Sequence, residues 1–108
     1  MAFIRAELRA FPRFAAGVLA QFHVAGCADD GQVMDVSRGG CKLLPFRLEP
    51  LVLLEPPHQS PLLLIIQSME ITARLAWSTP NYSALGCQFD QILTDDQLQT
   101  ITAGQRAL

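Results

Sequence analysis

Residues 18–44 read VLAQFHVAGCADDGQVMDVSRGGCKLL, and this stretch decides the fold. Apolar and polar side chains alternate over Val18–Val24, which is typical of a strand with one buried face. The run Asp29-Asp30-Gly31 is a strong hairpin signal, so we expect a turn there and a returning strand over Gln32–Val36. The start of the chain therefore predicts an antiparallel strand pair.

The same period-two pattern continues towards the C-terminus. A second turn over Ser37–Gly40 leads into an expected strand over Cys41–Leu44, and Leu62–Ile66 indicates a buried strand. One face of the next expected strand carries four apolar residues: Ile71, Ala73, Leu75 and Trp77. After a turn near Pro80, Leu85, Cys87 and Phe89 repeat the alternation. Short strands at this spacing predict an antiparallel sheet closed into a barrel or a sandwich.

Residues 45–61 hold five of the seven prolines, so this segment cannot form one central strand. Leu51–Leu54 is compatible with a short edge strand inside it. The aliphatic residues of this region and of Leu62–Ile66 have two readings, packing inside the monomer or a contact in a homodimer. We favour packing inside the monomer.

One helix is predicted over residues 94–103. Thr94 and Gln97 have the spacing of a capping box, and Asp95 follows the cap, where a carboxylate favours the helix dipole. Leu98 and Ile101 form a short apolar edge. We expect this helix to cap the barrel.

Composition narrows the class of protein. The chain has 108 residues, of which 50% are hydrophobic and 17% charged, which predicts one packed domain. A net charge of −2 argues against DNA or RNA as a partner. The longest aliphatic run, Leu62–Ile66, is too short to insert into a membrane. The start of the chain shows no apolar stretch typical of a signal peptide, so we expect a cytoplasmic protein. Three cysteines without a C-x-x-C pair are expected to be reduced, and no metal site is predicted.

Catalytic machinery is not evident in the sequence. Phosphate-loop, zinc-protease, serine-hydrolase and dinucleotide motifs are all missing. The carboxylate pairs Asp29-Asp30 and Asp95-Asp96 are explained as turn and helix-start residues. We therefore expect a protein that is not an enzyme and has no cofactor.

The arginines of the chain indicate that it binds a ligand, in place of catalysing a reaction. Arg5, Arg9 and Arg13 recur at intervals of four, and Arg38 lies at the second expected turn beside Asp35. An arginine fork suits phosphate oxygens and the O6/N7 edge of guanine, because each accepts two parallel N–H bonds. A carboxylate can accept from guanine N1–H and N2–H, which adenine does not offer. This set suits a ligand that carries both phosphates and guanines.

Three short motifs together resemble those of a known family. Arg9–Arg13 has the form R-x-x-x-R, Asp35–Gly40 has the form D-x-S-x-x-G, and Gly86–Phe89 has the form G-x-x-F. In this order they resemble the PilZ domain, a bacterial receptor for cyclic di-GMP, over about residues 9–103. The resemblance implies an all-β fold with one helix, a six-stranded antiparallel barrel over residues 14–108 that ends in the helix, preceded by a flexible segment over residues 1–13.

The resemblance also implies roles for individual residues. Arg9 and Arg13 would bind phosphates and guanine edges, and Asp35 and Ser37 would hold a guanine at a turn that Gly40 keeps open. Four further residues are candidates for the ligand site: Arg5 as an alternative first arginine, Leu8 at a position where many relatives carry an arginine, Arg38, and Trp77 as a stacking platform. Leu8 favours one ligand molecule per domain.

The expected function is therefore a cyclic di-GMP receptor without catalytic activity. Ligand binding would fold the N-terminal segment over the site and present a new surface to a protein partner. The resemblance suggests control of motility, adhesion or exopolysaccharide in biofilms. The alternative is an adaptor of the same fold that binds no nucleotide, and a single-stranded nucleic-acid barrel is disfavoured by the charge and the few aromatic residues.

Overall fold

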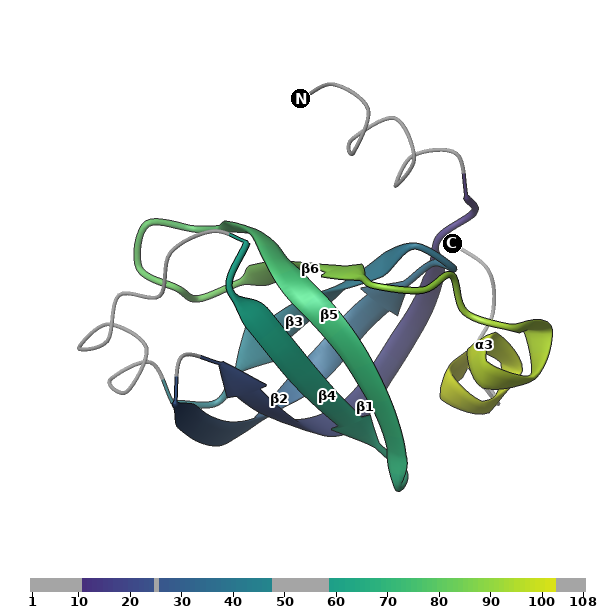
Figure 1. Ribbon diagram of the computed structural model, residues 1–108, viewed down its shortest axis with the longest axis horizontal. Coiled ribbons are helices and arrows are strands. Elements are labelled where there is room, and N and C mark those ends of the chain that lie inside the picture. The colour runs from purple at the N-terminus through teal and green to yellow at the C-terminus, as the bar shows by residue number, and fades with distance from the viewer. Residues whose placement is uncertain (1–10, 25, 48–58, 103–108) are drawn as a thin grey trace.

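Six antiparallel strands close into a barrel, and one helix follows them (Figure 1). The computed structural model describes residues 11–24, 26–47 and 59–102. The elements are β1 (Phe14–Val24), β2 (Cys27–Val36), β3 (Gly40–Pro45), β4 (Pro61–Ile66), β5 (Met69–Ser78), β6 (Leu85–Phe89) and α3 (Asp95–Thr102). Their order around the barrel is β1-β2-β3-β6-β5-β4, and β4 pairs back with β1. The predicted fold class is confirmed.

Alternation along each strand builds the core. Phe22 is fully buried on β1, whereas its neighbours Gln21 and His23 are exposed. On β6, Leu85, Cys87 and Phe89 are buried as the sequence predicts. Burial of a side chain as large as phenylalanine contributes about 1.5–3 kcal/mol, so the inward faces of six strands supply the main stabilisation.

The first hairpin turns earlier than the sequence predicts. Val24 pairs with Cys27, so the chain reverses around Gly26, whose φ of 79° lies in the left-handed region that favours glycine. The expected turn at Asp29-Asp30-Gly31 is wrong, because these residues lie within β2. Asp29 is buried there and accepts hydrogen bonds from the Arg47 side chain at 3.0 Å and the Asp30 amide at 2.7 Å.

β4 is an interior strand of the barrel. It pairs with β1 on one side and β5 on the other, and Leu62, Leu64 and Ile66 point into the core. For these three residues, packing inside the monomer is confirmed. The edge strand expected over Leu51–Leu54 lies outside the described residues, and a homodimer remains a prediction.

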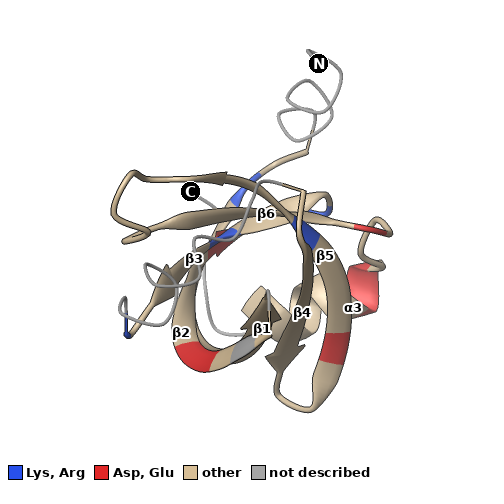
Figure 2. Ribbon diagram, turned by 60° about the vertical axis from the view of Figure 1, so that its left-hand side comes forward, with Lys and Arg blue, Asp and Glu red and all other residues tan. Residues whose placement is uncertain are grey.

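The C-terminal helix forms where the sequence places it. The Thr94 amide donates to Gln97 Oε1 at 2.9 Å and the Gln97 amide donates to Thr94 Oγ1 at 3.1 Å, which completes the predicted capping box. Ile101 is buried in the core cluster and Leu98 packs against it. Figure 1 shows α3 at one end of the barrel, where it contacts β1 and β2. In Figure 2, with the view turned towards the ring of strands, its acidic first turn is red.

Three irregularities in strand register shape one region of the barrel. They fall between Ala15 and Val18 on β1, between Val33 and Asp35 on β2, and between Leu75 and Trp77 on β5. An extra residue in one strand reverses the direction in which the following side chains point. Trp77 therefore leaves the face of Ile71, Ala73 and Leu75, and the predicted placement of all four on one face is wrong for Trp77, which is 39% exposed.

Two cysteines face each other inside the barrel. Cys41 on β3 is paired with Cys87 on β6, and both are free and buried. A hydrogen bond with Cys87 and burial together raise the pKa of the Cys41 thiol.

Within the described part of the chain, no helix combines the length and apolarity that a bilayer crossing requires.

Candidate ligand-binding site

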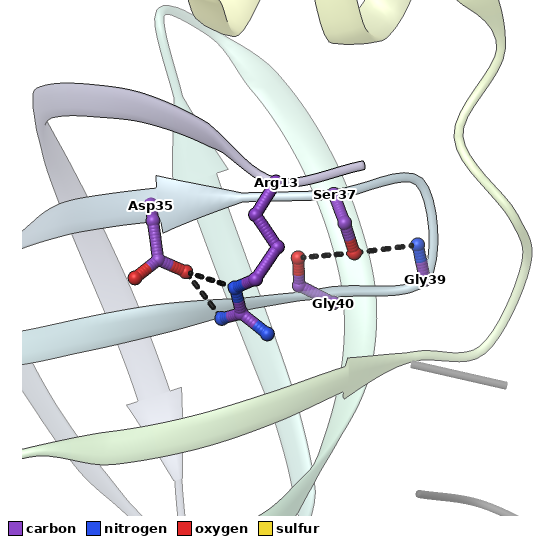
Figure 3. Close-up of polar contacts among 5 residues, drawn as sticks. All are labelled: Arg13, Asp35, Ser37, Gly39 and Gly40. Atoms are coloured by element: carbon purple, nitrogen blue, oxygen red, sulfur yellow. Dashed lines mark hydrogen bonds and ion pairs between the residues drawn. The ribbon is translucent and has the colours of Figure 1, made fainter. Parts of the chain in front are cut away.

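The two sequence motifs meet at one point on the barrel. Arg13 precedes β1 and Asp35 lies near the end of β2, and Arg13 Nε donates to Asp35 Oδ1 at 3.1 Å (Figure 3). Arg13 Nη2 also contacts this oxygen. The strand register explains the meeting, because Ala15 of β1 is paired with Asp35. Residues separated by 22 positions therefore present a guanidinium and a carboxylate side by side.

Ser37 shapes the turn that follows β2. Its hydroxyl accepts from the Gly39 amide at 3.2 Å and donates to the Gly40 carbonyl at 3.4 Å (Figure 3). The Ser37 amide also donates to the Gly40 carbonyl, at 2.8 Å. Ser37 is only 1% exposed, so this hydroxyl holds the conformation of the turn instead of facing solvent. Gly40 itself begins β3 and pairs with Gln88.

The side chain of Arg38 extends towards the helix α3. Its guanidinium pairs with Asp95 in the first turn of α3, and its carbonyl accepts from the Leu93 amide at 2.9 Å. The Gly39 carbonyl accepts from the Phe89 amide at the same distance, 2.9 Å. The motif turn is thus tied to both β6 and the segment that enters α3.

A row of outward residues crosses the sheet beside this turn. Asp35 is paired with Lys42 on β3, Lys42 with Gly86 on β6, and Gly86 with Trp77 on β5. The flanking residues Cys41 and Leu43 are buried, so Lys42 between them faces outward. We call Asp35, Lys42, Gly86 and Trp77 the outer row.

Gly86 makes room for the indole of Trp77. A Cβ atom at Gly86 would stand 2.0 Å from Trp77 Nε1, so the ring lies directly over the glycine backbone. The indole therefore covers the outer surface of β6 with part of its surface open to solvent. This geometry gives a physical reason for the glycine of the G-x-x-F motif.

Lys42 is the residue that sequence reasoning missed. The signal was available, because Lys42 is the only lysine of the chain and follows the D-x-S-x-x-G motif by two positions. Its relation to Asp35 and Trp77 depends on three strand registers and two bulges, which the sequence does not display. The remaining candidates, Arg5, Leu8 and Arg9, lie outside the described residues.

A separate hollow lies on another part of the surface. It has a volume of about 490 Å³, and its lining includes Leu19 of β1, Ile65 of β4 and Phe46, which follows β3. No residue of the two motifs lines it. The motif residues and the outer row therefore lie outside this hollow.

The arrangement can bind a ligand with both donor and acceptor edges. Arg13 retains N–H groups beyond those bound to Asp35, and a carboxylate accepts several hydrogen bonds. Trp77 offers an aromatic face, and Lys42 a positive charge. Phosphate groups, a base edge that donates hydrogen bonds and a planar ring would all find partners here.

Comparisons with known proteins indicate what this chain is similar to. The model of the PilZ domain family matches residues 7–104. Among solved structures, the fold is similar to one described as the Bacillus subtilis inhibitor of motility (MotI/DgrA), at 13% sequence identity and a TM-score of 0.49, with 84% of this chain and 46% of that chain covered. This chain thus spans about half of that protein's length. A search of the curated proteins finds no match. The family model covers most of the sequence and both arginine and aspartate motifs, and the chain therefore belongs to the PilZ domain family.

Proposed function

We propose that this protein is a receptor for cyclic di-GMP without catalytic activity. The observation that carries the proposal is the contact between Arg13 and Asp35, which joins the R-x-x-x-R motif to the D-x-S-x-x-G motif. Membership of the PilZ family supports the choice of ligand. The protein would change conformation when it binds and would pass the signal to a protein partner.

Each proposed contact follows from hydrogen-bond chemistry. Asp35 accepts from N1–H and N2–H of a guanine, and the side chain is 20% exposed, so a ligand can reach it. Arg13 donates to a phosphate or to guanine O6 and N7. Trp77 stacks on a guanine face. Ser37 and Gly40 act through the shape of the turn.

Ligand binding is expected to order the N-terminal segment. Arg9 would add a second guanidinium, and each hydrogen bond to a charged group contributes about 1.5–3 kcal/mol. Fixing one backbone residue costs about 1–2 kcal/mol, so a few phosphate contacts offset the ordering of several residues. Because Leu8 supplies no further guanidinium, we propose one ligand molecule per domain.

The first test is a calorimetric titration at low salt with cyclic di-GMP, and with GMP and cyclic di-AMP as controls. We expect binding of cyclic di-GMP alone with one ligand per chain. Replacement Arg13→Ala removes the phosphate fork and is expected to weaken binding by about 10- to 100-fold. An unchanged affinity in Arg13→Ala would refute the site but leave the ligand in place.

A thermal melt separates the receptor from an adaptor that binds no nucleotide. A ligand that binds only the folded state stabilises it, by about 2.7 kcal/mol at a concentration 100 times Kd. We expect saturating cyclic di-GMP to raise Tm by several degrees. A Tm that does not move at any concentration of cyclic di-GMP would favour the adaptor.

A further inference from the structure

Lys42 occupies the centre of the outer row. On one side it is paired with Asp35, and on the other with Gly86, over which the Trp77 indole lies. Adjacent strands are about 4.8 Å apart, and an extended lysine side chain reaches farther than one such step. The ammonium group of Lys42 therefore lies within reach of any ligand that spans Asp35 and Trp77.

The charge of Lys42 is not compensated by a described partner. Five basic residues fall in the part of the chain that the structure describes, and four of them form ion pairs: Arg13 with Asp35, Arg38 with Asp95, Arg47 with Asp29, and Arg74 with Asp90. Lys42 forms no ion pair among these described residues, although Asp35 is its direct cross-strand neighbour. The Asp35 carboxylate instead forms an ion pair with Arg13. The outer row thus presents a half-buried cation whose cross-strand carboxylate is already paired with Arg13.

The chemistry of a cyclic dinucleotide fits this order of groups. Each phosphate of such a ligand links its two nucleosides and so lies between the two bases. The outer row offers a base-edge acceptor at Asp35, a cation at Lys42, and an aromatic face at Trp77, in that order across the sheet. We propose that Lys42 binds a phosphate of the ligand, between a guanine held at Asp35 and a guanine stacked on Trp77. This inference rests on the proposed function.

The closing experiment compares two variants that lose the same charge. Lys42→Gln removes the cation of the outer row, and Arg47→Gln removes a cation five residues further along, just beyond the other end of β3. We expect Lys42→Gln to weaken cyclic di-GMP binding by about tenfold at low salt, as loss of one charge-assisted hydrogen bond predicts, and to reduce its salt dependence. Arg47→Gln is expected to stay within twofold, and Lys42→Arg to retain most of the affinity. Melting curves establish that each variant is folded.

A second readout uses the fact that the chain has a single lysine. Reductive methylation with ¹³C-formaldehyde labels Lys42 and the terminal amine, and titration with cyclic di-GMP is expected to shift the dimethyl-lysine resonance. Absence of binding by the wild-type protein would refute the proposed function. Binding by the wild-type protein with an unchanged Kd in Lys42→Gln and an unmoved lysine resonance would refute the role of Lys42 alone.

Discussion

At the scale of single residues, the site depends on where hydrogen-bond partners remain available. The Oδ1 atom of Asp35 accepts a hydrogen bond from Arg13, and the Asp35 side chain is still partly open to solvent. Ser37 has its hydroxyl engaged inside the turn. We therefore expect Asp35 to recognise a base directly, whereas Ser37 fixes the backbone that surrounds it.

Asp35→Asn tests the recognition of guanine. The amide keeps the size of the side chain but replaces one acceptor oxygen with an NH₂ group, which would face the N1–H and N2–H donors of guanine. We expect cyclic di-GMP binding to weaken by about 10- to 100-fold, as for a lost hydrogen bond to a charged group, and discrimination against cyclic di-AMP to fall. Competition calorimetry with both nucleotides measures each effect. Discrimination equal to that of the wild-type protein would place guanine recognition at another residue.

Gly86→Ala tests the position of the indole. The added methyl would occupy the space of the Trp77 ring, which must move because the contact would be only 2.0 Å. Trp77 is the only tryptophan, so its fluorescence reports the displacement directly. We expect a shift of the emission maximum and, since stacking contributes about 1–3 kcal/mol per base, cyclic di-GMP binding weaker by about tenfold.

The control for Gly86→Ala is the same change in a Trp77→Ala background. If the glycine acts only through the indole, its replacement adds nothing there, because the two residues form one coupled unit. Additive losses of affinity from the two changes would show that Gly86 has a separate role.

At the scale of elements, bulges and caps decide what the strands and helix present. The bulge on β5 turns Trp77 outward after three inward residues, and the one on β2 aligns Asp35 with Lys42. α3 is fixed by its capping box and by the ion pair between Arg38 and Asp95. This ion pair is largely exposed, so its contribution is small beside that of the buried Ile101.

Thr94→Ala tests the cap of α3. Loss of the side-chain acceptor leaves the Gln97 amide without its partner, which typically costs about 1 kcal/mol. We expect a lower free energy of unfolding by this amount in urea denaturation. Thr100→Ala is the matched control, because Thr100 lies inside the helix and only bonds back to the Asp96 carbonyl. Equal losses in the two variants would contradict a capping role.

At the scale of the whole molecule, closure of the barrel pairs every strand on both sides and encloses the two thiols. Burial and the hydrogen bond with Cys87 keep Cys41 protonated in the folded state, with a pKa above the ordinary value of 9.0. In the unfolded chain the thiol ionises at its ordinary pKa. The stabilisation is therefore complete below about pH 9 and is lost as pH rises towards the folded-state pKa.

This reasoning predicts an alkaline loss of stability. The free energy of unfolding, measured in urea between pH 7 and pH 10, should fall above about pH 9 with a slope of up to about 1.4 kcal/mol per pH unit for one thiol. Cys41→Ala lowers the stability at every pH through its cavity, so only the slopes are compared. A slope as steep in Cys41→Ala as in the wild-type protein would assign the pH dependence to other groups.

Much of the fold could be predicted because period-two alternation is a local property. Phe22, Leu64 and Cys87 lie inward as the pattern indicates, and the Thr94–Gln97 cap forms as predicted. The turn predicted at Asp29-Asp30-Gly31 was wrong because the chain already reverses a few residues earlier, around Gly26 with its positive φ. Strand pairing then draws Asp29 and Asp30 into β2.

The sequence by itself determined an antiparallel sheet of short strands, the helix with its cap, and the motifs whose resemblance to the PilZ family implies a barrel. It did so because alternation, capping and motif spacing each involve residues close along the chain. Only the tertiary structure decided that Arg13 meets Asp35, that Trp77 faces outward over Gly86, and that Lys42 lies between them. Those relations depend on the register between strands distant in sequence, and one inserted residue at a bulge is enough to reverse them.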